Sequence, residues 1–499
     1  MEYRIETDTL GEFKVPKNVY YGIQTARAKE NFKISGKKVE PEFIKSIAEV
    51  KKACAMTNCE VGLLSSEKAS AIIQACDEII EGKFHDQFVV DPIQGGAGTS
   101  HNMNANEVIA NRAVEILGGE LGDYSVVHPL DDVNEGQSTN DIYPTAGKIA
   151  VIRLLFRCKH NLEKLVESFG EKAQEFDDVI KMGRTQLQDA IPIRLGQEFA
   201  AYKAVISRDL LRFDIAIKQM SIMNIGGTAI GTGLNADVEY LYKVGPNIMK
   251  VTGLDIIQTT NLIDGTQNLD RFSFVSGIVK TCAINLSKIA NDLRLMSSGP
   301  TCGLGEIELP AKQAGSTIMP GKVNPVIPEV VNQVAFNIIG NDMTVTMAIE
   351  AGQLELNAFE PIIFYNLFES IRTLKGAVDT FTKNCIDGIV AKRNNTGNMV
   401  DNSIGIITAL SPHIGYVKAA EIAEESLKTG VTIKKLIVDK GIMNEEELNE
   451  VLNIYTMTNP GISGKRLLIK HHKLKKQKGF PLSVFLDDVG GMIAYNLDI

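Results

Sequence analysis

Four short stretches of the sequence gather small hydroxyl and amide side chains, which can hold an anion without bringing a competing negative charge. The most distinctive stretch, GSTIMPGKVNP, carries Ser316, Thr317, Lys322 and Asn324. Its two glycines and two prolines exclude a regular helix. We therefore expect these side chains on a loop between long helices, where one cation and several neutral donors suit a carboxylate.

The other three stretches, GGAGTSHNMNANEV, HPLDDVNEGQSTND and GRTQLQDAIP, lie next to helical patterns. The glycine-rich one feeds a helix, whose first N–H groups suit an anion. Each stretch taken alone is equally typical of an ordinary turn or helix cap. The candidate site residues they contribute are Thr99, Ser138, Thr139, Asn140, Thr185 and Gln186.

Taken together, the four stretches predict a receptor for a small dicarboxylate. Preformed neutral donors around a carboxylate favour removal of a proton from the adjacent carbon, because they stabilise the extra charge that develops. No Cys, His, Asp or Glu cluster has the spacing of a metal site, and we predict no metal ligands. Seven histidines in the chain give no pattern of a Ser-His-Asp triad.

Composition points to a helical protein. The chain has 499 residues, 44% of them hydrophobic but only 6% aromatic, so an aliphatic core of packed helices is expected. The net charge of −9 argues against nucleic acid as a partner. No signal peptide and no membrane-spanning apolar run is apparent, so we expect a cytoplasmic protein without a membrane partner.

Apolar residues repeat at alternating spacings of four and three along the middle of the chain, which predicts long helices packed nearly parallel in a bundle. The stripes run over 151–169, 195–220, 275–296 and 367–385, and a fifth helix is expected from about Pro328 into the 350s. The predicted domains are 1–142, mixed but mostly helical; 143–395, the central bundle; 396–464, small and helical; and 465–499, which begins with a basic run.

The polar stretches and several others resemble the aspartase/fumarase superfamily from about residue 3 to about residue 463. The matching segments, in order, are YYGIQTARAKENF, GAGTSHNMNANEV, QSTNDIYPTA, GRTQLQDA, TAIGTGLNA, NDLRLMSSGP, GSTIMPGKVNP and GQLELN. The resemblance implies an all-α fold of three domains. It also implies a central five-helix bundle, a twenty-helix core in a homotetramer, and active sites shared by three subunits.

The resemblance also implies roles for the candidate residues. Ser316 corresponds to the general base, and Lys322 with Asn324 to the holders of the carboxylate on the amino-bearing carbon. An unassisted serine is a poor base, so its alkoxide needs nearby positive charge and N–H donors. The groups implied around the other carboxylate are Thr99, Ser138, Thr139 and Thr317, and those around the leaving ammonium are Asn140, Gln186 and Thr185.

Gln186 favours the aspartase branch, since fumarases usually have histidine at this place. That branch implies reversible deamination of L-aspartate to fumarate without a required cofactor, and some members are activated by a divalent cation such as Mg²⁺. A fumarate hydratase on the same scaffold, or a non-catalytic structural member, remains an alternative. Thr317 departs from the second serine that is common in the family, and the last 35 or so residues match nothing expected of it.

Overall fold

The computed structural model of the protein describes residues 2–469, which form two compact units. Unit 1 comprises residues 2–172, Ala200–Leu304 and Leu309–Val390, and unit 2 comprises Ala173–Phe199, Gly305–Glu308 and residues 391–469. The predicted domain boundaries at 142, 395 and 464 stay predictions. Most of the predicted C-terminal extension, from residue 470 onward, lies outside the described residues.

Unit 1 begins with the mixed region expected from the sequence. Strands β1 (Tyr3–Asp8) and β2 (Gly11–Pro16) pair antiparallel in a hairpin. Four helices follow, in which small and aliphatic residues bury one face or more. They are α1 (Ile23–Asn31), α2 (Pro41–Glu60), α3 (Ser66–Ile80) and α4 (Thr99–Ile116), with a 3₁₀ turn at His85–Gln87.

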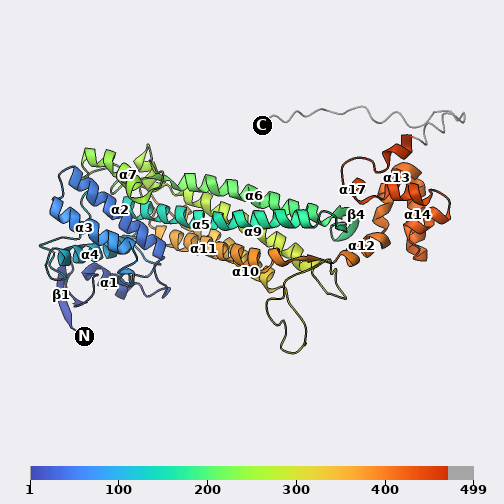
Figure 1. Ribbon diagram of the computed structural model, residues 1–499. Helices are drawn as coiled ribbons and strands as arrows, with labels where there is room; N and C mark the ends of the chain where they lie inside the picture. The colour runs from blue at the N-terminus through green and yellow to red at the C-terminus, as the bar shows by residue number, and fades with distance from the viewer. Residues whose placement is uncertain (1, 470–499) are drawn as a thin grey trace. The chain divides into compact units, whose positions relative to one another are not determined.

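Five long helices run side by side, mostly within unit 1 (Figure 1), which confirms the predicted all-α fold with a five-helix bundle. The apolar stripes of the first, third and fifth helices are buried along their whole lengths, so the four-three spacing marks the core. The helices are α5 (Thr139–Glu175), α6 (Leu195–Met220), α9 (Asp270–Met296), α10 (Val326–Glu350) and α11 (Glu360–Asn384).

A glycine sets how closely α5 and α11 approach each other. A Cβ atom at Gly147 would lie 2.0 Å from Cζ of Phe364, so only glycine fits beneath that ring. Farther along the same pair of helices, Asn161 Nδ2 donates to the Lys375 carbonyl oxygen at 3.3 Å. Unit 1 is completed by α7 (Val238–Thr252), α8 (Leu262–Gln267) and the parallel strands β5 (Ile222–Met223) and β6 (Ile257–Gln258).

Unit 2 contains an antiparallel hairpin and several short helices around their own core. The sequence predicted two amphipathic helices near 415–430 and 432–453, the second interrupted before Asn444. Both are present, and Asn444 caps α16 in a capping box with Glu447. The elements are β3 (Ile180–Thr185), β4 (Gln188–Arg194), α12 (Arg393–Asn402), α13 (Ile407–Ile414), α14 (Tyr416–Thr429), α15 (Ile433–Asp439), α16 (Glu445–Val451) and α17 (Ile454–Met457).

Short elements make up the rest: strands β7 (Ile307–Glu308) and β8 (Val390–Ala391) and 3₁₀ turns at Ile386–Gly388 and Ile404–Ile406. Within residues 2–469, no helix is both long enough and apolar enough to cross a lipid bilayer.

Candidate active site

Thr99 is the first residue of α4, and the turn before it is fixed by a close contact with α5. Gly98 has φ +90°, and a Cβ there would lie 2.5 Å from the ring of Tyr143. Glycine is therefore required twice, for its backbone conformation and for the ring beneath it. This contact brings the N-terminus of α4, with its unbonded N–H groups, next to the N-terminus of α5.

The segment leading into α5 is held by one buried carboxylate. Asp141 accepts hydrogen bonds from the backbone N–H groups of Ser138 at 3.0 Å, Gly226 at 3.0 Å and Thr228 at 3.1 Å. Burial raises the pKa of Asp141 to about 6 while these N–H groups lower it, so the carboxylate is ionised at neutral pH. Asp141 thus ties the row Ser138-Thr139-Asn140 to the 224–229 segment.

The hydroxyls of this row are acceptors within the chain, which leaves their hydrogens for another partner. Ser138 Oγ accepts from the Asn140 N–H at 3.2 Å, and Thr139 Oγ1 accepts from Asn102 Nδ2 at 3.2 Å. Asn140 Nδ2 donates to the Ala229 carbonyl oxygen at 2.7 Å, and its amide oxygen is the atom an ammonium group needs. Thr99 differs, because its hydroxyl donates to the Gly96 carbonyl oxygen at 2.7 Å.

Aromatic rings from four helices pack behind these two helix N-termini. Phe43, His101, Tyr143 and Phe364 contact one another from α2, α4, α5 and α11, and His101 Nδ1 lies 3.3 Å from the Tyr143 hydroxyl. Burial lowers the pKa of His101 to about 4, so its ring is neutral. This ring cluster fixes α4 against α5 close to Thr99 and Thr139.

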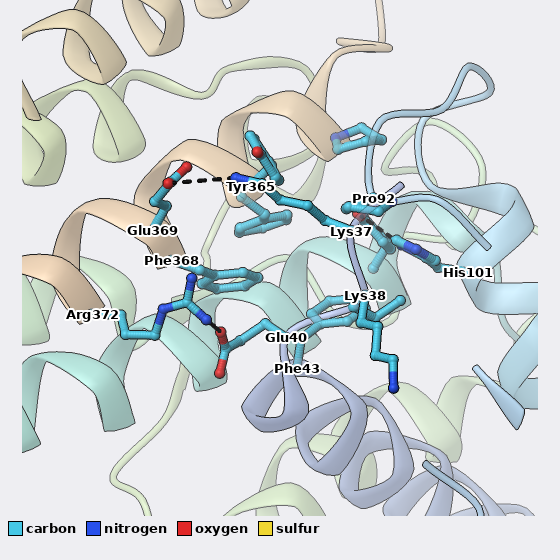
Figure 2. A pocket seen from close by; sticks show the side chains of 14 residues that line it. Lys37, Lys38, Glu40, Phe43, Pro92, His101, Tyr365, Phe368, Glu369 and Arg372 are labelled. Carbon is cyan, nitrogen blue, oxygen red and sulfur yellow. Dashed lines mark hydrogen bonds and ion pairs between the residues drawn. The ribbon is translucent and has the colours of Figure 1, made fainter. Parts of the chain in front are cut away.

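The ring cluster forms the floor of a cleft, shown in Figure 2, that is separate from the candidate site. None of the predicted site residues lines this cleft. Lys37 lies 3.6 Å from the Glu369 carboxylate and Arg372 lies 3.5 Å from the Glu40 carboxylate, so charges at the rim are paired with each other. We therefore assign the cleft to packing between α2 and α11.

The GSTIMPGKVNP stretch forms a loop that closes on itself between α9 and α10. The Gly315 N–H donates to the Lys322 carbonyl oxygen at 2.9 Å, and Asn324 Nδ2 donates to the Gly315 carbonyl oxygen at 2.6 Å. A Cβ at Gly315 would lie 2.2 Å from the Lys322 carbonyl oxygen, so glycine is needed for the closure. The loop thus brings Ser316, Lys322 and Asn324 together, with Thr317 and Lys322 exposed.

Ser316 has N–H donors of the kind that stabilise a serine alkoxide. Its Oγ accepts from the backbone N–H groups of Ile318 at 3.2 Å and Met319 at 2.9 Å. Both donors favour the alkoxide over the neutral hydroxyl, since they stabilise negative charge on the oxygen. The sequence predicted this loop as a break in the helices, and the structure adds the two N–H donors.

The Ser316 loop and the Thr99–Thr139 cluster lie at opposite ends of unit 1 (Figure 1). Lys148, near the start of α5, lies beside Phe272 at the start of α9, whereas Arg294 near its end bonds Asn332 of α10. A rise of 1.5 Å per residue separates Phe272 from Arg294 by about 30 Å. One chain alone therefore does not bring the two groups of candidate residues together.

Thr185 and Gln186 lie in unit 2, at the turn between β3 and β4. Gln186 and Leu187 have φ of 53° and 63°, the conformation of a two-residue hairpin turn, and Thr185 pairs with Gln188 across it. The stretch connects α5 to α6, and it does so as part of a strand pair, which the sequence did not predict. Gln186 is exposed at the hairpin tip.

Sequence reasoning missed the buried groups behind the candidate residues. Lys51 of α2 donates to Asn134 Oδ1 and to Gln137 Oε1, both at 2.8 Å, in the segment that leads into α5. One signal was available, because Ile47, Lys51 and Cys54 share a helical face at spacings of four and three. A lysine on an apolar stripe needs a buried partner.

Comparison with known proteins gives the same assignment over most of the chain. A family model described as Lyase matches residues 11–340, and one described as Fumarase C C-terminus matches residues 406–459. The chain belongs to the aspartase/fumarase superfamily. The predicted resemblance is confirmed.

Curated members of the superfamily are similar over nearly their whole length. An aspartate ammonia-lyase of a Bacillus species is 54% identical, covering 93% of this chain and 99% of the relative. The aspartate ammonia-lyase of Bacillus subtilis is 53% identical, with coverage of 94% and 99%. These relatives support the predicted carbon–nitrogen lyase rather than the alternatives.

Solved structures of the superfamily have the same fold. A fumarate lyase:delta crystallin structure from Brucella melitensis bound to cobalt superimposes with a TM-score of 0.90 at 48% identity, covering 92% of this chain and all of that chain. A class II fumarase from Schistosoma mansoni gives a TM-score of 0.88 at 33% identity, with coverage of 92% and 100%. A shared scaffold thus serves different members.

Proposed function

We propose that the chain is an aspartate ammonia-lyase, which converts L-aspartate reversibly to fumarate and ammonia. The curated aspartate ammonia-lyases, 54% and 53% identical to the chain, support this activity. The structural observation that carries the mechanism is Ser316 Oγ, which accepts two backbone N–H bonds on a self-closing loop. A serine in that setting can take a proton because its alkoxide is stabilised.

In the proposed reaction, Ser316 Oγ takes a proton from the carbon beside the distal carboxylate of L-aspartate. The electron pair of that C–H bond moves into the carboxylate, which becomes a doubly charged aci-carboxylate. The groups proposed to surround it are Thr99, Ser138, Thr139 and Thr317. Of these, Thr99 would donate only after its hydroxyl leaves the Gly96 carbonyl oxygen. The electrons then return to form the carbon–carbon double bond as the carbon–nitrogen bond breaks and ammonia leaves.

The other end of the substrate needs different partners. Lys322 and Asn324 are proposed to hold the carboxylate on the amino-bearing carbon. Asn140, Gln186 and Thr185 are proposed to hold the ammonium group, because their side-chain oxygens can accept from it. Asn324 now donates to the Gly315 carbonyl oxygen at 2.6 Å, so binding a carboxylate would use its second N–H.

We also propose a homotetramer in which three subunits complete each site. Separation of the Ser316 loop from Thr139 within one chain supports this. An exposed apolar stripe on α10 supports it as well, since such a face favours burial against another chain. Its members and their exposed fractions are Phe336 at 63%, Ile339 at 42%, Met343 at 63% and Met347 at 59%.

A direct comparison of two substrates tests the activity. Purified protein mixed with L-aspartate is expected to release fumarate, detected by its ultraviolet absorbance, and ammonia in equal amounts. Turnover of L-malate with no turnover of L-aspartate would instead establish a fumarate hydratase. Inactivity on both would favour a structural member of the superfamily.

The proposed chemistry uses only side-chain and backbone groups, and we propose no required cofactor. Dialysis against a chelator is therefore expected to leave most of the L-aspartate turnover, and added Mg²⁺ is expected to change it only modestly. Complete loss on dialysis with recovery on adding Mg²⁺ would contradict this. We further propose a cytoplasmic location.

A further inference from the structure

Lys51 is a fully buried cation directly behind the segment that carries the candidate residues. It lies on α2 with 0% of its surface exposed, and Nζ donates at 2.8 Å to Asn134 Oδ1 and at 2.8 Å to Gln137 Oε1. Burial lowers the pKa of Lys51 to about 8, so the side chain is an ammonium at neutral pH. An ammonium has only donors to offer.

This one-sided chemistry sets the orientation of two amides. Because Lys51 can only donate, Asn134 and Gln137 must turn their oxygens toward it, and neither amide can flip without losing that bond. The other side of Asn134 is also used, since its Nδ2 donates to the Gln137 carbonyl oxygen at 3.2 Å. The segment before α5 is therefore locked from its buried side.

Asn134 in turn fixes the orientation of two side-chain amides on α4. Asn134 Oδ1 also accepts from Asn102 Nδ2 at 3.2 Å and from Asn106 Nδ2 at 3.1 Å, so both amides must present nitrogen to it. Among residues 2–469, the buried oxygens Asn102 Oδ1 and Asn106 Oδ1 have no hydrogen-bond partner. Both amides thus keep the donor orientation although their oxygens go unpaired.

These hydrogen bonds run from Lys51 through Asn134 and Asn102 to Thr139, a candidate substrate contact, and we call the series the relay. Asn102 Nδ2 also donates to Thr139 Oγ1 at 3.2 Å, so the Thr139 oxygen is an acceptor and its hydrogen is directed elsewhere. If Asn102 flipped, its oxygen would take that hydrogen. Thr139 would then present no donor to a substrate carboxylate.

We propose that Lys51 is a positioning residue that keeps Thr139 a hydrogen-bond donor to the substrate, through Asn134 and Asn102. The proposal rests on the proposed contact between Thr139 and the distal carboxylate. A role confined to stability would lower the folded fraction without changing how Thr139 contributes to kcat/KM.

A double-mutant cycle on the assembled enzyme tests the relay. Lys51→Met keeps the length of the side chain but removes its charge and donors, and we expect kcat/KM for L-aspartate to fall about 10- to 100-fold. The kcat/KM of Thr139→Val is expected to fall by a similar factor. The kcat/KM of the double variant should lie within about twofold of that of Thr139→Val, because without the Thr139 hydroxyl the relay has no group left to orient.

Lys52→Met is the matched control, since the neighbouring lysine pairs with Asp77 at 2.6 Å and contacts nothing in the relay. Its kcat/KM is expected to stay unchanged. Should Lys51→Met fail to fold, Asn102→Asp replaces it in the same cycle, because an aspartate cannot donate to Thr139. Losses that multiply in the double variant, or an unchanged kcat/KM in the single variant, would overturn the relay.

The same cycle separates failure of the relay from failure of the proposed site. If Thr139→Val leaves kcat/KM unchanged, Thr139 does not contact the substrate, and the relay falls with that assignment. If Thr139→Val is impaired but Lys51→Met and Asn102→Asp are not, the site assignment stands and only the relay is overturned.

Discussion

Ser316 is the residue on which the proposed chemistry depends most. Its two backbone N–H donors stabilise the alkoxide form of its hydroxyl. Ser316→Ala is expected to lower kcat for L-aspartate by about 10³-fold or more, as loss of a general base does. Elution volume in size-exclusion chromatography and melting temperature should stay near wild type, since this half-buried hydroxyl contributes little packing. Retention of most activity would remove Ser316 from the role of base.

The buried His101 makes the free energy of unfolding depend on pH. Burial lowers its pKa from 6.5 to about 4, so the unfolded chain takes up a proton at a pH where the folded chain does not. The stabilisation is therefore complete above about pH 6.5 and is lost as the pH falls toward 4, up to about 3 kcal/mol per chain.

This dependence predicts how the melting temperature changes with pH. Between pH 7 and pH 4.5, the melting temperature of the wild-type protein should fall further than that of His101→Gln, because glutamine does not take up a proton. His160→Gln, which replaces a histidine whose side chain is 65% exposed, is the control and should follow wild type. Equal losses in wild type and His101→Gln would contradict the assignment.

The hydroxyl and amide clusters could be found from sequence because they interrupt helical patterns with glycine and proline. Their partners could not. Lys51 and Asn102 lie inside ordinary helices, and only the folded chain shows that they bond Asn134 and Thr139. Which hydroxyls donate and which accept depends on those buried neighbours, so the donor pattern of the candidate site had to await the structure.

At the scale of elements, α5 begins earlier than the sequence indicated. The predicted bundle begins at residue 143, yet α5 starts at Thr139 and contains Pro144. Pro144 has no N–H to donate to the Asn140 carbonyl oxygen one turn before it. That oxygen accepts from Asn224 Nδ2 at 3.0 Å instead. A side chain from a distant segment thus bonds the carbonyl oxygen that the proline leaves without a helical donor. Local sequence rules cannot anticipate such a partner.

The turn before α4 predicts the effect of a single methyl group. In Gly98→Ala, the Cβ would lie 2.5 Å from the Tyr143 ring at φ +90°, so Thr99 and the N-terminus of α4 must shift. We expect kcat/KM to fall by at least about 10-fold, because donors displaced by even 1 Å bind an anion poorly. Steady-state kinetics with L-aspartate measures this.

Gly118→Ala is the matched control for that substitution. Gly118 has φ +83°, but a Cβ added there would meet nothing within 4 Å, so alanine introduces only the backbone strain. Its free energy of unfolding is expected to fall by about 1 kcal/mol, the size of that strain, with little change in kcat/KM. Equal kinetic losses in both variants would show that backbone strain, not the Tyr143 contact, matters.

At the scale of the whole molecule, unit 1 carries two of the three groups of proposed site residues, at opposite ends, and unit 2 carries the third. Phe272 and Arg294 mark ends of α9 about 30 Å apart, one beside α5 and the other beside the start of α10. The four-three spacing predicted the bundle itself. It could not show which exposed stripe meets another chain, because buried and interfacial apolar faces have the same pattern.

Shared sites predict that two impaired variants partly restore each other when they assemble together. When Ser316→Ala and Thr139→Val chains are co-expressed in equal amounts and assemble at random, about a quarter of the sites should contain both native residues. Specific activity with L-aspartate should therefore rise to about a quarter of wild type, above the roughly 1 to 10% expected for Thr139→Val and the still lower activity of Ser316→Ala. Co-expression of Ser316→Ala with Asn324→Ala is the control, because one loop supplies both residues and no site can be native. No recovery in the first pair would mean that Ser316 and Thr139 act from the same chain. Recovery in the control would mean that Ser316 and Asn324 are not supplied by one loop.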